Sequence, residues 1–111
     1  MAASHSVGSG LPTLAAHAYH LRYTLQWANV PEGDSPPEGD WESSWEKHVV
    51  TDAEWVALRS EIRDRYERVV AWMARNEDWS ADHASIRFLS VLPHVAYHLG
   101  AMRVLLKLIE A

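Results

Sequence analysis

Two histidines four residues apart, His94 and His98, are the side chains whose type and spacing best fit metal chemistry. On a helix, residues four apart lie one turn above each other on the same face, so two imidazole nitrogens can reach one ion. The pair shares its face with apolar side chains and is expected to point into the core. Because an unpaired buried polar group costs about 1–3 kcal/mol, both rings need partners there, and a shared metal ion would satisfy both.

His17 is the predicted third ligand. It lies about 40° from the middle of the apolar stripe formed by Leu14, Leu21 and Leu25, whereas His20 lies about 100° away and is expected to be a boundary residue paired with a neighbour or with water. Three neutral nitrogens would leave at least one position on a divalent ion open, which is typical of catalytic sites. Imidazole suits several ions, so Zn, Ni, Fe, Mn or Cu remain candidates. The remaining histidines are predicted to be solvated in loops or at element ends: His5, His48 and His83.

Two amphipathic helices are predicted in the first part of the chain. The first covers about residues 13–29 and has Thr13 as its N-cap. The second covers about residues 52–76 and begins with the capping-box pattern of Thr51 and Glu54.

A third helical segment is predicted from about residue 82 to residue 109, and Pro93 falls inside it. Proline removes a helical hydrogen bond and clashes with the preceding turn, so the segment is either kinked or divided between about Ser90 and Leu92. No part of the chain alternates with strand period. The predicted fold class is therefore all-α, with three long helices in an up-down bundle.

A long loop joins the first two helices. Residues 31–50 are rich in Pro, Gly and acidic residues, and the tetrapeptide Pro-Glu-Gly-Asp occurs at 31–34 and again at 37–40. The repeat is interpreted as a local loop expansion, with an acidic cation or partner site as the alternative. Trp41 and Trp45 are expected to hold the second half of the loop against the bundle.

Composition excludes several functions. Ten Lys and Arg against 15 Asp and Glu give a net charge of −5, which argues against a nucleic-acid binder. The absence of cysteine excludes disulfides, thiolate metal sites and a cysteine nucleophile. No apolar run approaches the roughly 18 residues of a membrane span, and no secretory signal is recognisable, so a cytoplasmic protein is expected. One domain is predicted over residues 11–111, preceded by a flexible lead-in over residues 1–10.

Two segments resemble a known family. Residues 14–22, Leu-Ala-Ala-His-Ala-Tyr-His-Leu-Arg, and residues 94–103, His-Val-Ala-Tyr-His-Leu-Gly-Ala-Met-Arg, look like the signature segments of the DinB-like superfamily. The resemblance covers about residues 11–109 and also includes Trp41-Glu-Ser-Ser-Trp45. It implies a four-helix bundle in which one histidine of an early helix and a His-x-x-x-His pair of the last long helix hold a divalent ion.

Carried over residue by residue, the resemblance makes His94 and His98 the pair and His17 the early ligand, with His20 as the alternative one turn along. It further implies a thiol-S-transferase that uses a low-molecular-weight thiol, whose pKa the metal would lower. Family members usually have an additional helix before the first histidine helix, where this chain has a Ser- and Gly-rich decapeptide. Either the start is shortened or a second subunit covers the open side, so a homodimer is expected.

Two alternatives remain open at the level of sequence. One is a non-catalytic helical dimerisation or stress-response module with no working metal site. The other is a small-ligand pocket lined by aromatic side chains, namely Tyr19, Tyr23, Trp27 and Trp72.

Overall fold

The computed structural model describes residues 1–80 and 84–110. Its helices are α1 (Leu14–Ala28), α2 (Asp52–Arg75) and α3 (Ala84–Glu110), and short 3-10 turns occur at η1 (Ala2–Ser4), η2 (Val30–Glu32) and η3 (Ser43–Trp45). The described residues contain no strand. The all-α class and the three long helices are confirmed, with each predicted boundary of α1 and α2 within one residue.

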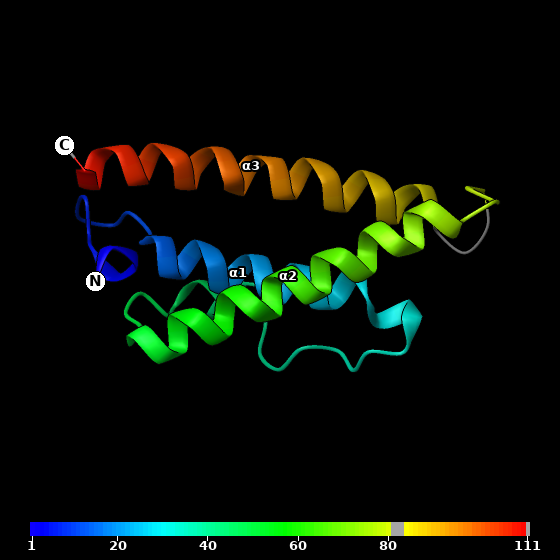
Figure 1. Ribbon diagram of the computed structural model, residues 1–111, viewed down its shortest axis with the longest axis horizontal. Helices are drawn as coiled ribbons and strands as arrows, with labels where there is room; N and C mark the ends of the chain where they lie inside the picture. Colours follow the sequence, from blue (N-terminus) through cyan, green and yellow to red (C-terminus); the bar gives the residue numbers. More distant parts are fainter. Residues whose placement is uncertain (81–83, 111) are drawn as a thin grey trace.

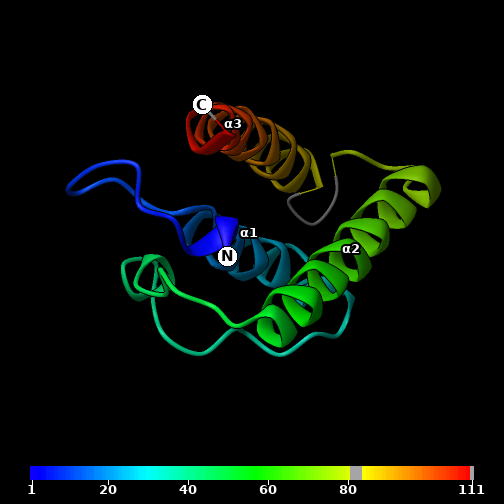
Figure 2. The same cartoon turned by 60° about the vertical axis from the view of Figure 1, so that its left-hand side comes forward.

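Helix α1 lies between the other two helices and packs against both of them (Figures 1 and 2). One core cluster joins the start of α1 to the end of α3 through Leu14 and Leu105. A second joins the other end of α1 to α2 and α3 through Leu25, Val69 and Val91. The central position of α1 is what allows its histidines to face α3.

Side-chain caps begin the first two helices. Thr13 Oγ1 accepts a hydrogen bond from Ala16 N at 3.2 Å and donates to His48 O at 2.8 Å, so the cap also attaches the end of the long loop to α1. Thr51 and Glu54 form the predicted capping box, with both reciprocal hydrogen bonds present.

Helix α3 continues through Pro93 without a break, so of the two alternatives predicted for this segment the division near residues 90–92 is wrong. The amide that proline lacks would have bonded to the carbonyl of Leu89, one turn earlier. Leu89 and Pro93 are both exposed, and water can therefore serve that carbonyl. Residues 82 and 83 of the predicted segment lie outside the described residues.

The acidic repeat in the loop has structural partners. Asp34 of the first copy forms a two-bond ion pair with Arg68 at 2.6 and 3.0 Å, and this hydrogen bonding lowers the pKa of the Asp34 carboxyl. Glu32 of the same copy pairs with Arg75 and with Arg87. In the second copy, the Asp40 carboxylate accepts a hydrogen bond from Ser43 N at 2.7 Å. These contacts support the interpretation of the repeat as a loop element.

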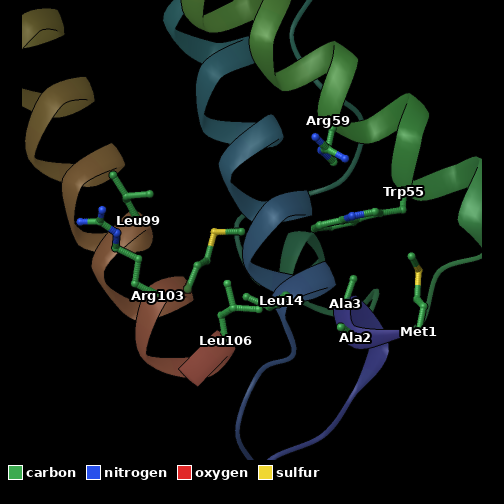
Figure 3. A pocket seen from close by; sticks show the side chains of 10 residues that line it. Met1, Ala2, Ala3, Leu14, Trp55, Arg59, Leu99, Arg103 and Leu106 are labelled. Carbon is green, nitrogen blue, oxygen red and sulfur yellow. The ribbon is translucent and has the colours of Figure 1, made fainter. Parts of the chain in front are cut away.

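The first residues of the chain also contact the bundle. Ala3 of η1 is buried in the cluster around Leu14, and the Ser4 hydroxyl exchanges hydrogen bonds with the backbone of Val50 at 2.9 and 3.2 Å. Beside η1, apolar side chains from all three helices, Leu14 of α1 among them, line a surface pocket (Figure 3).

Much of α3 is apolar and uncovered. Six of its apolar side chains are more than half exposed: Ile86, Leu89, Tyr97, Leu99, Val104 and Leu108. By length and composition α3 could cross a membrane, whereas no span was expected from the sequence, because no uninterrupted apolar run approaches 18 residues. Only 11% of its most apolar 18-residue window is buried, so this helix is not the enclosed centre of the fold.

Candidate metal centre

Four histidines from two helices meet in the interior. His17 and His20 come from α1, and His94 and His98 come from α3. His20 is 0% exposed, His98 1% and His17 6%, whereas His94 is half-buried. The predicted inward orientation of the α3 pair is confirmed for His98 and holds in part for His94.

Three of these histidines form a group that could hold a metal ion. His20, His94 and His98 each offer one ring nitrogen, and the three atoms lie within 4.8 Å of one another. Nε2 of His94 lies 2.9 Å from Nε2 of His98. Imidazole nitrogens that converge from two helices are the donor set that binds Zn²⁺ and other divalent transition ions.

His17 contacts the group from one side. Its Nδ1 lies 3.0 Å from Nδ1 of His98, whereas His94 approaches the Nε2 atom of the same ring. The prediction that His17 is the third ligand stays a prediction, because the three-nitrogen group contains His20 in that place.

The expectation that His20 lies at a boundary is wrong. The long loop returns over this side of α1, and its two tryptophans cover the ring. Trp45 stacks on His20 with ring centres 4.1 Å apart and planes 18° apart, and Trp41 meets it edge-on at 4.3 Å. Trp45 also contacts His17 edge-on at 5.1 Å. The prediction that Trp41 and Trp45 hold the loop against the bundle is thereby confirmed.

Burial keeps the imidazoles neutral. Desolvation, followed by the electrostatic influence of His94 and His17, lowers the pKa of His20 to about 4. Desolvation, followed by the influence of the neighbouring histidines, lowers the pKa of His98 to about 3. The pKa values of His17 and His94 are also lowered by burial. At neutral pH all four rings are therefore unprotonated bases, the form that coordinates metal.

Among the four histidines of the group, two buried ring nitrogens have no hydrogen-bond partner. They are Nε2 of His20 and Nδ1 of His94. Leaving a buried polar atom unpaired costs about 1–3 kcal/mol, so such atoms in a folded protein call for an explanation. For His20 Nε2, which belongs to a ring of the three-nitrogen group, coordination of an ion is a direct explanation. The residues present thus fit a divalent metal.

The other sequence candidates lie elsewhere. His5 and His48 are exposed, as predicted, and His83 lies outside the described residues. The aromatic side chains proposed to line a ligand pocket line neither of the two pockets found among the described residues: Trp27 is 47% exposed, and Trp72 packs against Arg87 and Trp79. Of the four aromatic candidates, Tyr23 stacks beside His20 with ring centres 6.5 Å apart.

A sharper sequence signal for His20 is visible in retrospect. Trp41 and Trp45 are spaced four apart in a short turn, as are the α3 histidines on their helix, and two tryptophans so placed can cover a polar face of a neighbouring helix.

Comparisons of the chain with protein-family models, with curated proteins and with solved structures found no match. The geometry of the histidine group therefore carries the functional argument.

Proposed function

We propose that the protein binds one divalent transition-metal ion through His20, His94 and His98. The observation that carries the proposal is the convergence within 4.8 Å of three neutral imidazole nitrogens, from the buried His20 and His98 and the half-buried His94. His20 Nε2 supports it further, because it is buried without any other partner.

The two edges of the His98 ring favour this ligand set over one containing His17. His94 faces Nε2 of His98, and His17 faces Nδ1. An ion shared by His94 and His98 therefore binds at the Nε2 edge, away from His17. Ligation through Nε2 puts the His98 proton on Nδ1, where it donates to His17 Nδ1. In this arrangement His17 orients His98, as outer partners of ligand histidines commonly do.

Three imidazole ligands leave at least one position of a divalent ion open. An ion bound in this way acts as a Lewis acid and lowers the pKa of a water or thiol that reaches the open position. The resemblance of residues 14–22 and 94–103 to the DinB-like superfamily supports a thiol, rather than water, at the open position. Because the chain lacks cysteine, this thiol would come from a separate small molecule. We therefore propose metal-dependent transfer of a low-molecular-weight thiol to an electrophile as the activity to assay.

The second candidate is a non-catalytic helical module without a working metal site. The observation that favours it is the enclosure of the histidine group, since His20 and His98 are buried and two tryptophans cover His20. This candidate predicts that the histidines serve packing alone and that metal is dispensable.

We also propose that a second copy of the chain covers α3. A standard interface buries about 800 Å² on each partner, and five of the exposed apolar side chains share one side of α3 and would provide a large part of that area at roughly 100 Å² each: Ile86, Leu89, Tyr97, Val104 and Leu108. Monomeric proteins rarely expose continuous apolar patches of that size.

Elemental analysis of protein purified without an affinity tag or chelator tests the metal proposal. About one equivalent of Zn, Ni, Fe or Mn is expected, and the paired substitution His94→Ala and His98→Ala should abolish it. His5→Ala and His48→Ala together form the matched control, because both residues are exposed and lie outside the group. A wild-type protein that holds no metal and takes none up on titration would leave the non-catalytic module as the better account.

A further inference from the structure

Ser44, in the turn η3, is hydrogen-bonded to the histidine group. Its Oγ lies 2.7 Å from Nδ1 of His20 and 2.6 Å from the backbone carbonyl oxygen of Trp41. A carbonyl oxygen can only accept, and a serine hydroxyl has a single proton to donate. The Ser44 proton therefore goes to Trp41 O, and Ser44 Oγ must accept the second hydrogen bond from His20 Nδ1.

This assignment fixes the tautomer of His20. With its proton on Nδ1, the neutral ring carries its lone pair on Nε2. Nε2 is the buried atom of His20 that has no hydrogen-bond partner, and the ring centre lies 5.1 Å from that of His94 and 5.0 Å from that of His98. A lone pair in that position is available to a metal ion.

The surrounding side chains hold the ring in place. Trp45 stacks along one face of His20, and the edge-to-face contact of Trp41 comes from the same turn that carries Ser44. A half turn of the imidazole about its Cβ–Cγ bond would keep the ring in the same plane but would move Nδ1 to the other edge and break the hydrogen bond to Ser44. The loop and the ligand ring are thus ordered as one unit.

We propose that Ser44 is a positioning residue for the metal centre, which holds His20 in its Nδ1-protonated tautomer so that Nε2 is presented as the ligand atom. The proposal rests on the proposed function and deepens it, because it makes the loop between α1 and α2 part of the metal centre. Outer hydrogen bonds of this kind fix ring orientation, and their loss commonly reduces metal affinity about 10- to 100-fold.

The neighbouring serine provides a matched control. Ser43 Oγ accepts a hydrogen bond from Asp40 N at 2.9 Å and donates to Asp40 O at 3.2 Å, so its hydroxyl stabilises the turn and is hydrogen-bonded to no histidine ring within the described residues. Ser43→Ala weakens the same turn as Ser44→Ala, and the His20 hydrogen bond stays intact. Ser44→Thr retains the hydroxyl and should preserve the tautomer.

The tautomer is measured on metal-free protein labelled with ¹⁵N in histidine, by two-bond proton–nitrogen correlations of the imidazole rings. His20 should show a protonated Nδ1 in the wild type, in Ser43→Ala and in Ser44→Thr. In Ser44→Ala the Nδ1 proton loses its acceptor, and signals of the Nε2-protonated tautomer should appear.

Zinc titration of the same four proteins measures the consequence. Ser44→Ala should bind one Zn²⁺ about 10- to 100-fold more weakly than the wild type, with Ser43→Ala and Ser44→Thr within a few-fold of it. Equal losses in Ser43→Ala and Ser44→Ala, or unchanged affinity and tautomer in Ser44→Ala, would overturn the role of Ser44 and leave the metal proposal standing. A wild type that binds no Zn²⁺ would overturn the metal proposal. In that case, loss of the His20 Nδ1 proton in Ser44→Ala alone would still show that Ser44 controls the tautomer of His20.

Discussion

The Nδ1 atoms of His17 and His98 lie 3.0 Å apart. Two ring nitrogens that close must share one proton, because two lone pairs or two N–H groups would repel each other. His98 thus uses one ring nitrogen toward α1 and the other toward His94. In the proposed site, Nε2 of His98 binds the metal ion, and Nδ1 is held by His17. Substitutions of the surrounding histidines should therefore differ in their effect on metal binding.

Substitution of His20 and of His17 should have different effects on metal binding. His20→Ala removes a ligand and should abolish stoichiometric binding, whereas His17→Ala leaves three ligands and should bind one ion about 10- to 100-fold more weakly. Isothermal titration with Zn²⁺ measures both quantities. His48→Ala, at an exposed position, should match the wild type. The reverse order, with binding abolished in His17→Ala and retained in His20→Ala, would restore His17 as the third ligand.

The stability of the metal-free protein should decrease as the pH falls below about 6.5. An unfolded histidine gains a proton near that pH, but burial lowers the pKa of His20 to about 4 and that of His98 to about 3 in the folded state. The unfolded state therefore binds more protons between these values, and protonation favours unfolding. Each of the two histidines can contribute a slope of up to about 1.4 kcal/mol per pH unit.

Urea unfolding at pH 7.5, 6.5 and 5.5 in the presence of a chelator measures this slope. Asp34 also has a lowered pKa, but its contribution falls away only near and below its ordinary pKa of about 3.8, outside this range. His20→Gln should reduce the dependence on pH, even though it lowers the absolute free energy of unfolding. A midpoint that is constant from pH 7.5 to 5.5 would show that the rings are accessible to protons in the folded state.

Local signals in the sequence predicted the helices and the α3 pair. Capping groups such as Thr13 and Thr51 act within one turn, so their neighbours in sequence suffice to place α1 and α2. Likewise, the spacing of His94 and His98 sets their common face by helix geometry alone.

Features that depend on distant contacts were not predictable in the same way. The helical wheel of α1 placed His20 outside the apolar stripe, and only the fold of the loop, through Trp41 and Trp45, buries it. The continuity of α3 through Pro93 likewise depends on its surroundings in the fold. Leu89 and Pro93 are both exposed, so water can reach the carbonyl that Pro93 leaves unpaired, and the periodicity of the sequence does not indicate this exposure.

Arg87 should be a principal stabilising residue at the end of the molecule away from the termini. Its guanidinium carbon lies 3.9 Å from the centre of the Trp72 ring, and its Nε donates to Ala28 O at 2.6 Å. Its side chain is 9% exposed and also pairs with Glu32 at 3.2 Å. Arg87 thereby connects the ends of all three helices.

Arg87→Ala should lower the free energy of unfolding by about 2–4 kcal/mol, because it removes a cation–π contact, leaves the buried Ala28 carbonyl without its side-chain donor and removes one of the two ion pairs of Glu32. Arg87→Lys should recover only part of the loss, since an ammonium group lacks the planar face that lies over Trp72. Arg103→Ala is the control, because its exposed side chain has no ion pair within the described part of the chain. Urea unfolding measures the free energy of unfolding of each variant. An equal decrease in Arg87→Ala and Arg103→Ala would contradict the stabilising role of Arg87.

The exposed face of α3 should make the protein dimeric at micromolar concentration. Leu89 is 64% exposed and Val104 60% exposed, and they lie on the side of α3 opposite its buried residues. The paired substitution Leu89→Glu and Val104→Glu should yield a monomer, because burying unpaired carboxylates in an interface is strongly unfavourable.

Sedimentation equilibrium measures the mass of each protein. Val56→Glu is the matched control, because Val56 is 64% exposed on α2 and its substitution should leave the dimer intact. Circular dichroism establishes that each variant keeps its helices. A wild-type protein that sediments as a single monomeric species and binds no apolar dye would contradict the proposed second copy, and a monomer that co-sediments with neutral phospholipid vesicles would show that lipid covers α3 instead.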